Sequence, residues 1–233
     1  KGDSKRAVDD YLSLAQVKAN RLGDERMQAN VTNALGVGYQ NLGQLDHADS
    51  SFRTAIDLRR KLGDAEGEAG SLRNLASIQA LQGDFKGADA SLKAARPLVE
   101  STGNPKAMAD FVNDVGVFEE ERGEFRKALD AYREALNLRQ SLRDPRLIGQ
   151  SMLNVGFAFY QVGEFDNAQT YWDQAAVIYS KIQDQVGLVQ ARQGGALAQI
   201  ARGDFVSARQ ALEQALHDAE SLQMAEEQST SLS

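Results

Sequence analysis

The chain has 233 residues and a formal net charge of -7, and its longest run of lysine and arginine is the three residues 59–61. A nucleic-acid partner, which needs a basic stripe for its phosphates, is therefore not expected. Cysteine is absent, which excludes disulfides and thiolate chemistry, and no apolar run approaches the roughly 20 residues that span a membrane. These features agree with a cytoplasmic protein that has no membrane span.

One stretch of the chain recurs five times in the same register, with turn glycines 40 residues apart at Gly43, Gly83, Gly123, Gly163 and Gly203. Alanine follows each glycine five and twelve residues later. Between these alanines stands a bulky residue, at Phe52, Leu92, Tyr132, Trp172 and Leu212. We interpret this bulky position as core packing rather than as a ligand contact. A fixed period of this size and a helical apolar spacing predict an all-α solenoid of stacked antiparallel helix pairs, without strands.

In chain order, residues 1–22 look like the second helix of a repeat whose first helix is missing. Pairs of helices then follow. The first helices are expected at roughly 24–42, 64–82, 104–122, 145–162 and 184–202, and the second at roughly 45–62, 85–102, 125–142, 165–182 and 205–222. A short polar N-cap begins each first helix, at Asp24, Asp64, Asn104, Asp144 and Asp184. The turn glycine supplies the left-handed conformation that ends it.

These elements predict a single array over residues 1–233. Its full repeats are 24–63, 64–103, 104–143, 144–183 and 184–223, and partial repeats lie at 1–22 and 224–233. Residues 224–233 align with 64–73 at four periods, so we expect a further repeat to start there. The array is then a fragment of a larger protein. One residue breaks the pattern, because Pro97 falls inside a predicted second helix and is expected to kink it or end it early.

A small residue stands seven before each turn glycine, at Gly36, Ala76, Gly116, Gly156 and Ala196, and an aromatic residue four before some of them, at Tyr39 and Phe159. Together with the alanine–bulky–alanine pattern, this resembles the tetratricopeptide repeat over nearly the whole chain. The unit is longer than the commonest form of about 34 residues. It is similar to the units of bacterial signalling and regulatory proteins and of kinesin light chain-like adaptors. The resemblance implies a right-handed superhelix whose first helices line a concave groove for a peptide or a partner helix.

The resemblance places candidate partner-binding residues on the first helices. They are Asn30, Asn33, Arg73, Asn74, Asp110, Asn113, Asp114, Glu120, Gln150, Asn154, Phe157 and Tyr160. Amides can hold an extended backbone through paired donors and acceptors, and the acidic third repeat favours lysine or arginine in a ligand. Phe157 and Tyr160 are candidate apolar contacts for a partner. The alternative is that the polar residues are merely solvated and that Phe157 packs between neighbouring first helices.

We expect a non-enzymatic interaction module, the scaffold or regulatory arm of a larger signalling protein. Its partner would be a protein or peptide with basic residues, or another domain of the same chain. Two alternatives remain open: self-association, and the sensing of a peptide or small molecule that controls an attached effector domain. We expect no metal or cofactor, since the two histidines, His47 and His217, lie in distant repeats. Nor is catalysis expected, because the carboxylates of residues 119–121 point to different faces of a helix.

Overall fold

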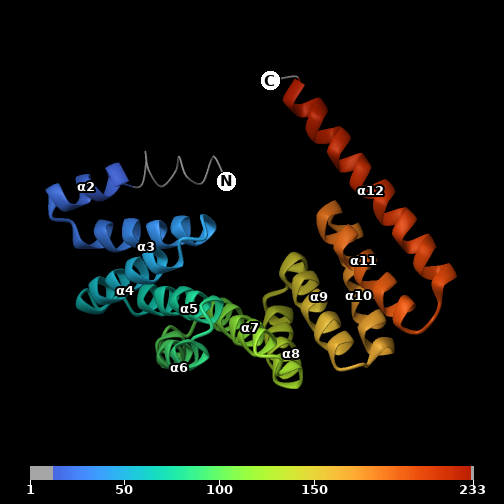
Figure 1. The fold of residues 1–233 in the computed structure, drawn as a ribbon, viewed down its shortest axis with the longest axis horizontal. Coiled ribbons are helices and arrows are strands. Elements are labelled where there is room, and N and C mark those ends of the chain that lie inside the picture. Colours follow the sequence, from blue (N-terminus) through green and yellow to red (C-terminus); the bar gives the residue numbers. More distant parts are fainter. Residues whose placement is uncertain (1–12, 232–233) are drawn as a thin grey trace. The chain divides into compact units, whose positions relative to one another are not determined.

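A computed structural model describes residues 13–231, and all regular secondary structure in this range is α-helical. The helices are α2 (Ser13–Leu22), α3 (Glu25–Asn41), α4 (Leu45–Lys61), α5 (Ala65–Leu81), α6 (Phe85–Ser101), α7 (Pro105–Glu121), α8 (Phe125–Leu142), α9 (Pro145–Gln161), α10 (Phe165–Lys181), α11 (Gln185–Ala201) and α12 (Phe205–Ser231) (Figure 1). The predicted fold class, stacked helix pairs of an α-solenoid, is confirmed. Residues 1–12 of the predicted first helix lie outside the described range.

Short polar side chains begin the first helix of each pair, as the sequence predicts. The Oδ1 atom of Asp24 accepts a hydrogen bond from the Met27 amide at 2.9 Å, and that of Asp184 accepts from the Gly187 amide at 3.1 Å. The same cap forms at Asp64, Asn104 and Asp144. Each satisfies a backbone donor that has no partner within the helix. The five turn glycines all have positive φ, between +75° and +82°, which ends the first helix of each pair.

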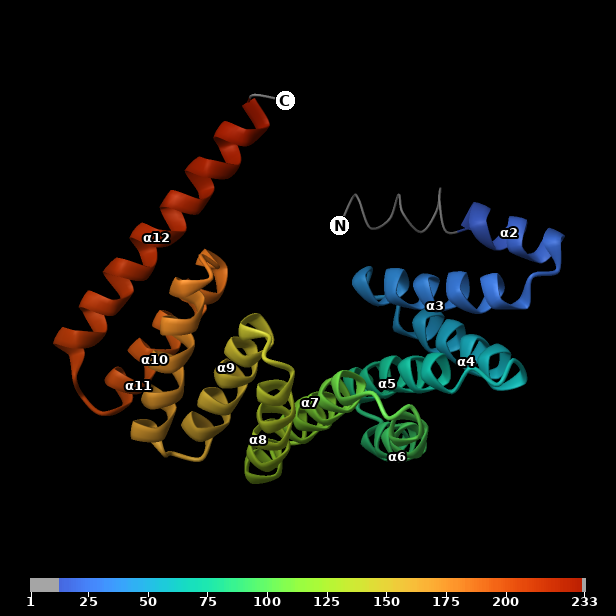
Figure 2. The ribbon, with the colours of Figure 1, turned by 180° about the vertical axis from the view of Figure 1, so that it is seen from behind.

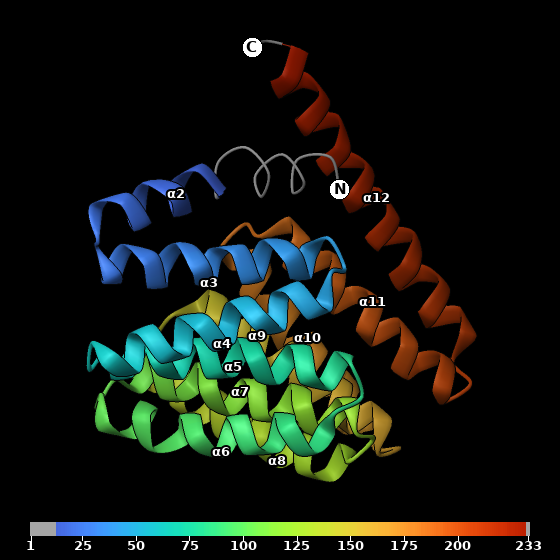
Figure 3. The same ribbon diagram turned by 60° about the vertical axis from the view of Figure 1, so that its left-hand side comes forward.

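The chain divides into two compact units, Lys1–Asp114 and Val115–Ser233, and the division falls within α7. In the first unit α2 packs on α3, α3 on α4, α4 on α5 and α5 on α6, and Figure 3 shows α3, α4 and α5 stacked in that order. The ring of Phe52 is fully buried against Gly36, where an added Cβ atom would lie 2.5 Å from the ring atom Cε1. The small residue therefore sets how closely α3 and α4 approach.

In the second unit, α8 packs on α9, α9 on α10, α10 on α11 and α11 on α12 (Figure 2). Trp172 is only 3% exposed and lies between two glycines of the neighbouring helices. Added Cβ atoms would lie 2.7 Å from its ring at Gly156 and 2.5 Å at Gly194. Tyr132 packs on Gly116 in the same way. The bulky position is therefore core packing, and aromatic rings fit there because glycine faces them.

Two sequence expectations about helix ends are wrong. The last helix does not end near residue 222, because α12 continues to Ser231. Met224 stands where the other repeats have an aspartate or asparagine N-cap, so the signal that begins a new helix is missing there. Of the two effects expected of Pro97, a kink or an early end, the early end is wrong, since α6 continues to Ser101. The continuous α12 gives no support to the assignment of residues 224–233 to a further repeat.

Candidate partner-binding site

In the first unit, the predicted amide residues lie together on α3 and α5. The Oδ1 atom of Asn33 accepts hydrogen bonds from the Ser71 hydroxyl at 2.9 Å and from Nδ2 of Asn74 at 3.3 Å. Asn30 accepts from Arg59 Nη2 at 3.3 Å. An amide has two donor hydrogens and an acceptor oxygen with two lone pairs, so these bonds use only part of the capacity of each side chain. The cluster is therefore orientated by its own bonds before any partner arrives.

Behind this cluster lies a buried cation that sequence reasoning missed. Arg59 is 9% exposed, and its Nη1 atom donates to the Gly67 carbonyl at 2.6 Å and to the Ser71 hydroxyl at 2.8 Å. Desolvation lowers the pKa of the Arg59 guanidinium, and the charge of Asp64 opposes that shift. The second unit repeats the arrangement, since buried Arg139 donates to the Ser151 hydroxyl at 3.1 Å. The signal was present in the sequence, because both members of the pair recur at two periods.

The acidic side chains of the third repeat that lie in the first unit form ion pairs with neighbouring cations. Arg73 Nε donates to Asp114 Oδ2 at 2.5 Å, which joins two predicted site residues to each other. Lys106 Nζ lies 2.8 Å from Asp110 Oδ2, one helical turn away on α7. Arg73, Lys106 and Asp110 line a cavity of about 310 Å³ with mixed charge, and half-buried Asn113 is not part of its lining. The two aspartates of the third repeat that lie in this unit are therefore paired with cations, whereas the preference for a basic ligand stays a prediction.

In the second unit, three predicted residues line one cavity of about 480 Å³: Glu120, Asn154 and Phe157. The other lining residues are Val117, Tyr132, Leu153, Trp172, Gln190, Gln193, Gly194 and Leu197. Most stand at the groove positions of the first helices: Val117 and Glu120 on α7, and the others on α9 and α11, which lie side by side (Figures 1 and 2). We call this cavity the second-unit groove. Its volume falls within the range of about 300–1,000 Å³ that is common for ligand sites.

Two buried aromatic residues form part of the second-unit groove, which sequence reasoning did not foresee. The Tyr132 hydroxyl donates to Glu120 Oε2 at 2.8 Å and so orientates the carboxylate. Trp172 Nε1 donates to the Leu153 carbonyl at 3.2 Å. Both polar atoms of these core rings are thereby satisfied, as buried tyrosine and tryptophan require. The two residues contribute both to the core and to the lining, whereas the sequence suggested only the first role.

Two predicted site residues of the second unit do not line the second-unit groove. The Tyr160 ring lies 5.4 Å from the Phe165 ring and 6.0 Å from the Trp172 ring, between centroids, so it packs on the core. Gln150 is exposed on α9. Phe157 is half-buried, packs on the core and also lines the groove, so both interpretations of this residue hold in part.

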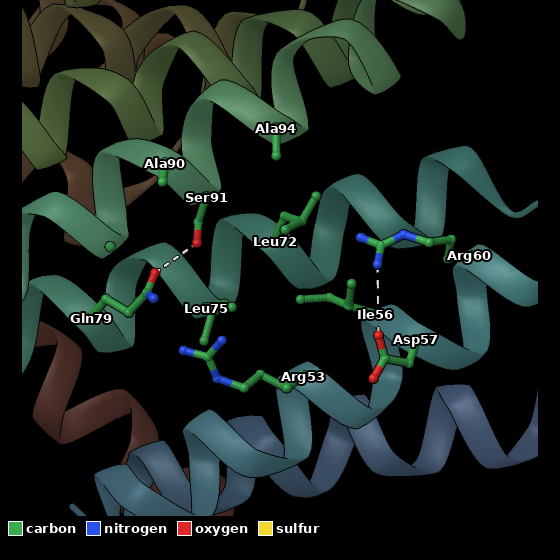
Figure 4. Close-up of a pocket in the computed structure, with 11 residues that line it drawn as sticks. Arg53, Ile56, Asp57, Arg60, Leu72, Leu75, Gln79, Ala90, Ser91 and Ala94 are labelled. Carbon is green, nitrogen blue, oxygen red and sulfur yellow. Dashed lines mark hydrogen bonds and ion pairs between the residues drawn. The ribbon is translucent and has the colours of Figure 1, made fainter.

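A second cavity of the first unit, about 390 Å³, lies over α5 between α4 and α6, and no sequence signal was attached to it (Figure 4). Its walls carry Arg53 and Arg60, and Gln79 accepts a hydrogen bond from Ser91 at 2.7 Å at one end. Both arginines already have carboxylate partners. Arg53 lies 2.7 Å from Asp49, and Arg60 pairs with Asp57 and Glu68. The α6 wall is open because it has only small residues, Gly87, Ala90, Ser91 and Ala94.

Within the described residues, no group of three or more histidine, aspartate or glutamate side chains is placed to hold a metal ion. None of the described helices is long and apolar enough to cross a membrane.

The geometry defines a class of protein, an α-solenoid of helical hairpins with exposed groove positions on its first helices. Residues 27–101 match the family model of the tetratricopeptide repeat. This match confirms the predicted tetratricopeptide repeat over residues 27–101, and the described helices beyond it continue the same stacked-hairpin fold. A comparison with the curated proteins found no significant match.

Several solved structures share the fold of this chain. BtubC (BKLC) from P. vanneervenii superposes with a TM-score of 0.82 at 21% identity, over 94% of this chain and 92% of that one. A Podosopora anserina putative kinesin light chain with nearly identical TPR-like repeats gives 0.73 at 16% identity, over 86% and 97%. A Rap protein complexed with competence and sporulation factor gives 0.76 at 17% identity, over 95% of this chain and 63% of that one. At these identities the likeness establishes the fold alone.

Proposed function

We propose that the chain is a cytoplasmic, non-enzymatic protein-interaction module that holds a peptide or a helix of its partner against the groove positions of its first helices. One observation carries the proposal. Three residues that the resemblance to the tetratricopeptide repeat places at groove positions, Glu120, Asn154 and Phe157, line one cavity. The amide cluster of Asn33 and Asn74 offers hydrogen-bonding groups at the same register in the first unit. The fold is one that serves protein interaction, and the complex of the similar Rap protein agrees with that use.

The experiment first isolates a partner by affinity capture with the whole chain, and then measures its affinity with purified components by calorimetry. Phe157→Ala and Asn74→Ala each alter a groove position, in the second and the first unit. We expect at least one of them to weaken binding by about tenfold, since a minority of interface residues dominates affinity. Melting curves verify that each variant is folded. Unchanged affinity in both variants, with both folded, would refute groove binding.

Self-association is a second candidate, favoured by an apolar strip on α12. Phe205 is 66% exposed, Leu212 42% and Leu216 60%, although the repeat position of Leu212 is buried in earlier repeats. These residues line a hollow of about 360 Å³ together with Arg209 and Glu213, which form an ion pair at 2.7 Å. A strip that carries both signs of charge is self-complementary, so a second copy of the chain can lie against it across a two-fold axis.

Sedimentation velocity across a range of concentrations tests this second candidate. A dimer that Leu216→Lys converts to a monomer supports it. Leu216 is exposed, so the substitution leaves the core intact. A wild-type chain that stays monomeric at the highest concentration rules it out, and this result would leave the groove proposal untouched.

A further inference from the structure

The charged side chains that line the second-unit groove are of one sign. Its lining contains one carboxylate, Glu120, and no lysine, arginine or histidine. Its apolar side chains include two that are substantially exposed, Val117 and Leu197. Amides of three other residues, Asn154, Gln190 and Gln193, complete the lining. A groove that combines apolar area with a negative charge excludes acidic segments by repulsion and favours cationic ones.

The floor of this groove is apolar because of one glycine. Nine residues before the turn glycine, the second, third and fourth repeats have Asn74, Asp114 and Asn154, whereas the fifth has Gly194. A Cβ atom at Gly194 would lie 2.5 Å from the Trp172 ring, so any side chain there would occupy the place of the ring. The glycine therefore lets the indole form part of the lining, at a position where the second, third and fourth repeats have a polar side chain and the first has Ala34. This floor suits a bulky apolar group.

The carboxylate is held ready for a cation. Its Oε2 atom accepts from the Tyr132 hydroxyl at 2.8 Å, and a carboxylate has about four lone-pair sites, so capacity remains for a second donor. The cation nearest in sequence, Arg122, is engaged elsewhere: its Nη1 atom lies 3.2 Å from Glu119 Oε2 and its guanidinium lies over the Phe118 ring. An incoming ammonium or guanidinium group thus meets a partly desolvated, orientated acceptor, where charge-assisted hydrogen bonds are strong.

We propose that the second-unit groove binds a segment of a partner protein in which a bulky apolar side chain is followed or preceded by lysine or arginine. The apolar side chain lies against Phe157, Trp172 and Leu197, and the cationic group binds Glu120. The inference rests on the proposed function, since it names the chemistry of the partner that the same groove takes. It assigns specificity to two features that distinguish this groove from the rest of the array, the carboxylate held by Tyr132 and the side-chain-free position at Gly194.

The test selects ligands from random sequences, so the partner need not be identified first. A phage library of short random peptides is selected on the whole wild-type chain, and the enriched sequences are synthesised. Trp172 is the only tryptophan of the chain and lines the groove, so its emission reports binding directly. We expect enriched peptides that combine a bulky apolar residue with lysine or arginine at a fixed spacing. They should change the tryptophan emission saturably.

Variants then separate charge from apolar contact. Glu120→Gln keeps an acceptor for the Tyr132 hydroxyl and should weaken the selected peptide about tenfold or more, because a charged hydrogen bond is lost. Glu120→Lys, used in a new selection, should reverse the enrichment toward aspartate and glutamate. Glu134→Lys changes the net charge by the same amount at an exposed position of α8, and should alter nothing. Leu197→Gln should weaken binding through loss of apolar contact.

The outcomes distinguish the inference from the proposed function. A selected peptide that keeps its affinity when its lysine or arginine is replaced by glutamate, but loses it in Leu197→Gln, overturns the charge specificity and leaves groove binding in place. Binding that persists in Leu197→Gln and in Glu120→Gln, both folded by circular dichroism, places the ligand elsewhere and overturns the inference. Absence of any saturable peptide overturns both proposals.

Discussion

The small residue seven before each turn glycine and the bulky residue nine after it are matched in size along the chain. Where the small residue is glycine, at Gly36, Gly116 and Gly156, the bulky one is aromatic, at Phe52, Tyr132 and Trp172; where it is alanine, at Ala76 and Ala196, the bulky one is leucine, at Leu92 and Leu212. The contact explains the match, because a Cβ atom at Gly36 would lie 2.5, 2.7 and 2.9 Å from three atoms of the Phe52 ring. An alanine therefore fits only beside a side chain smaller than an aromatic ring.

The prediction concerns the pair Gly36 and Phe52. Gly36→Ala forces the ring to shift, which costs about 1–3 kcal/mol for overpacking, and gains about 0.5–1 kcal/mol from better helix propensity. We expect a net loss of about 1 to 2 kcal/mol in the free energy of unfolding. Phe52→Leu alone leaves unfilled space and also destabilises. The double variant restores the combination found at residues 76 and 92, so it should be more stable than the sum of the single effects predicts.

Urea unfolding followed by circular dichroism measures the four corners of this cycle. We expect a favourable coupling free energy of about 1 kcal/mol or more, well above the roughly 0.3–0.5 kcal/mol within which independent sites add. Gly70→Ala is the matched control, because a Cβ atom there meets only Arg59 Nη1 at 4.0 Å. It should stabilise by the helix-propensity gain, about 0.5–1 kcal/mol. Additive effects in the cycle, or a Gly36→Ala variant as stable as Gly70→Ala, would refute the size-matching argument.

Three further predictions concern other positions. Arg143 and Gln183 have φ of 56°, so replacing either with glycine should relieve left-handed strain and raise the urea midpoint, by about 0.5–1 kcal/mol in stability; an unchanged midpoint would contradict this. Burial, with the nearby charge of Asp184, raises the pKa of Tyr179 from 10.0 to about 12. Its contribution to stability is therefore complete below pH 10 and is lost as the pH rises toward 12. Over that range the wild-type chain should lose stability more steeply than Tyr179→Phe, and parallel losses would refute this prediction. Arg59→Ala removes the guanidinium that donates to the buried Ser71 hydroxyl and leaves a void, so it should destabilise the chain by about 3 kcal/mol or more. The fall in the unfolding midpoint measures this effect. A loss below about 1 kcal/mol would argue against a structural role for Arg59.

The helices could be predicted from sequence because every repeat carries the same local signals. A cap such as Asp24 and a turn glycine such as Gly43 act within a few residues, and their spacing makes five independent observations of one rule. The end of α12 could not be predicted from the period, since the N-cap that begins the next helix in other repeats is missing at Met224. Aligning repeats predicts where a helix should end, but the helix ends there only if the capping and turn residues are present.

The positions of the candidate site residues could be predicted from the sequence, but their contacts with one another could not. The repeat register placed Asn154 and Phe157 at the groove, whereas it could not say that Asp114 is paired with Arg73, 41 residues away. Such pairings depend on side-chain reach between neighbouring helices and not on the period. The contribution of Trp172 to the lining also escaped prediction, because it follows from the absence of a side chain at Gly194, one helix further along.

The contacts between helices have a consequence for how such an array can be rebuilt by duplication or recombination. The pair of Gly36 and Phe52 lies within one hairpin and travels with it. The pairs of Trp172 with Gly194 and of Arg59 with Ser71 each join one hairpin to the next. A crossover at a hairpin boundary would separate these partners, whereas a crossover inside a hairpin, at the turn glycine, would keep them together. That second crossover would instead separate matched pairs such as Gly36 and Phe52, so each site of exchange divides one kind of packing pair.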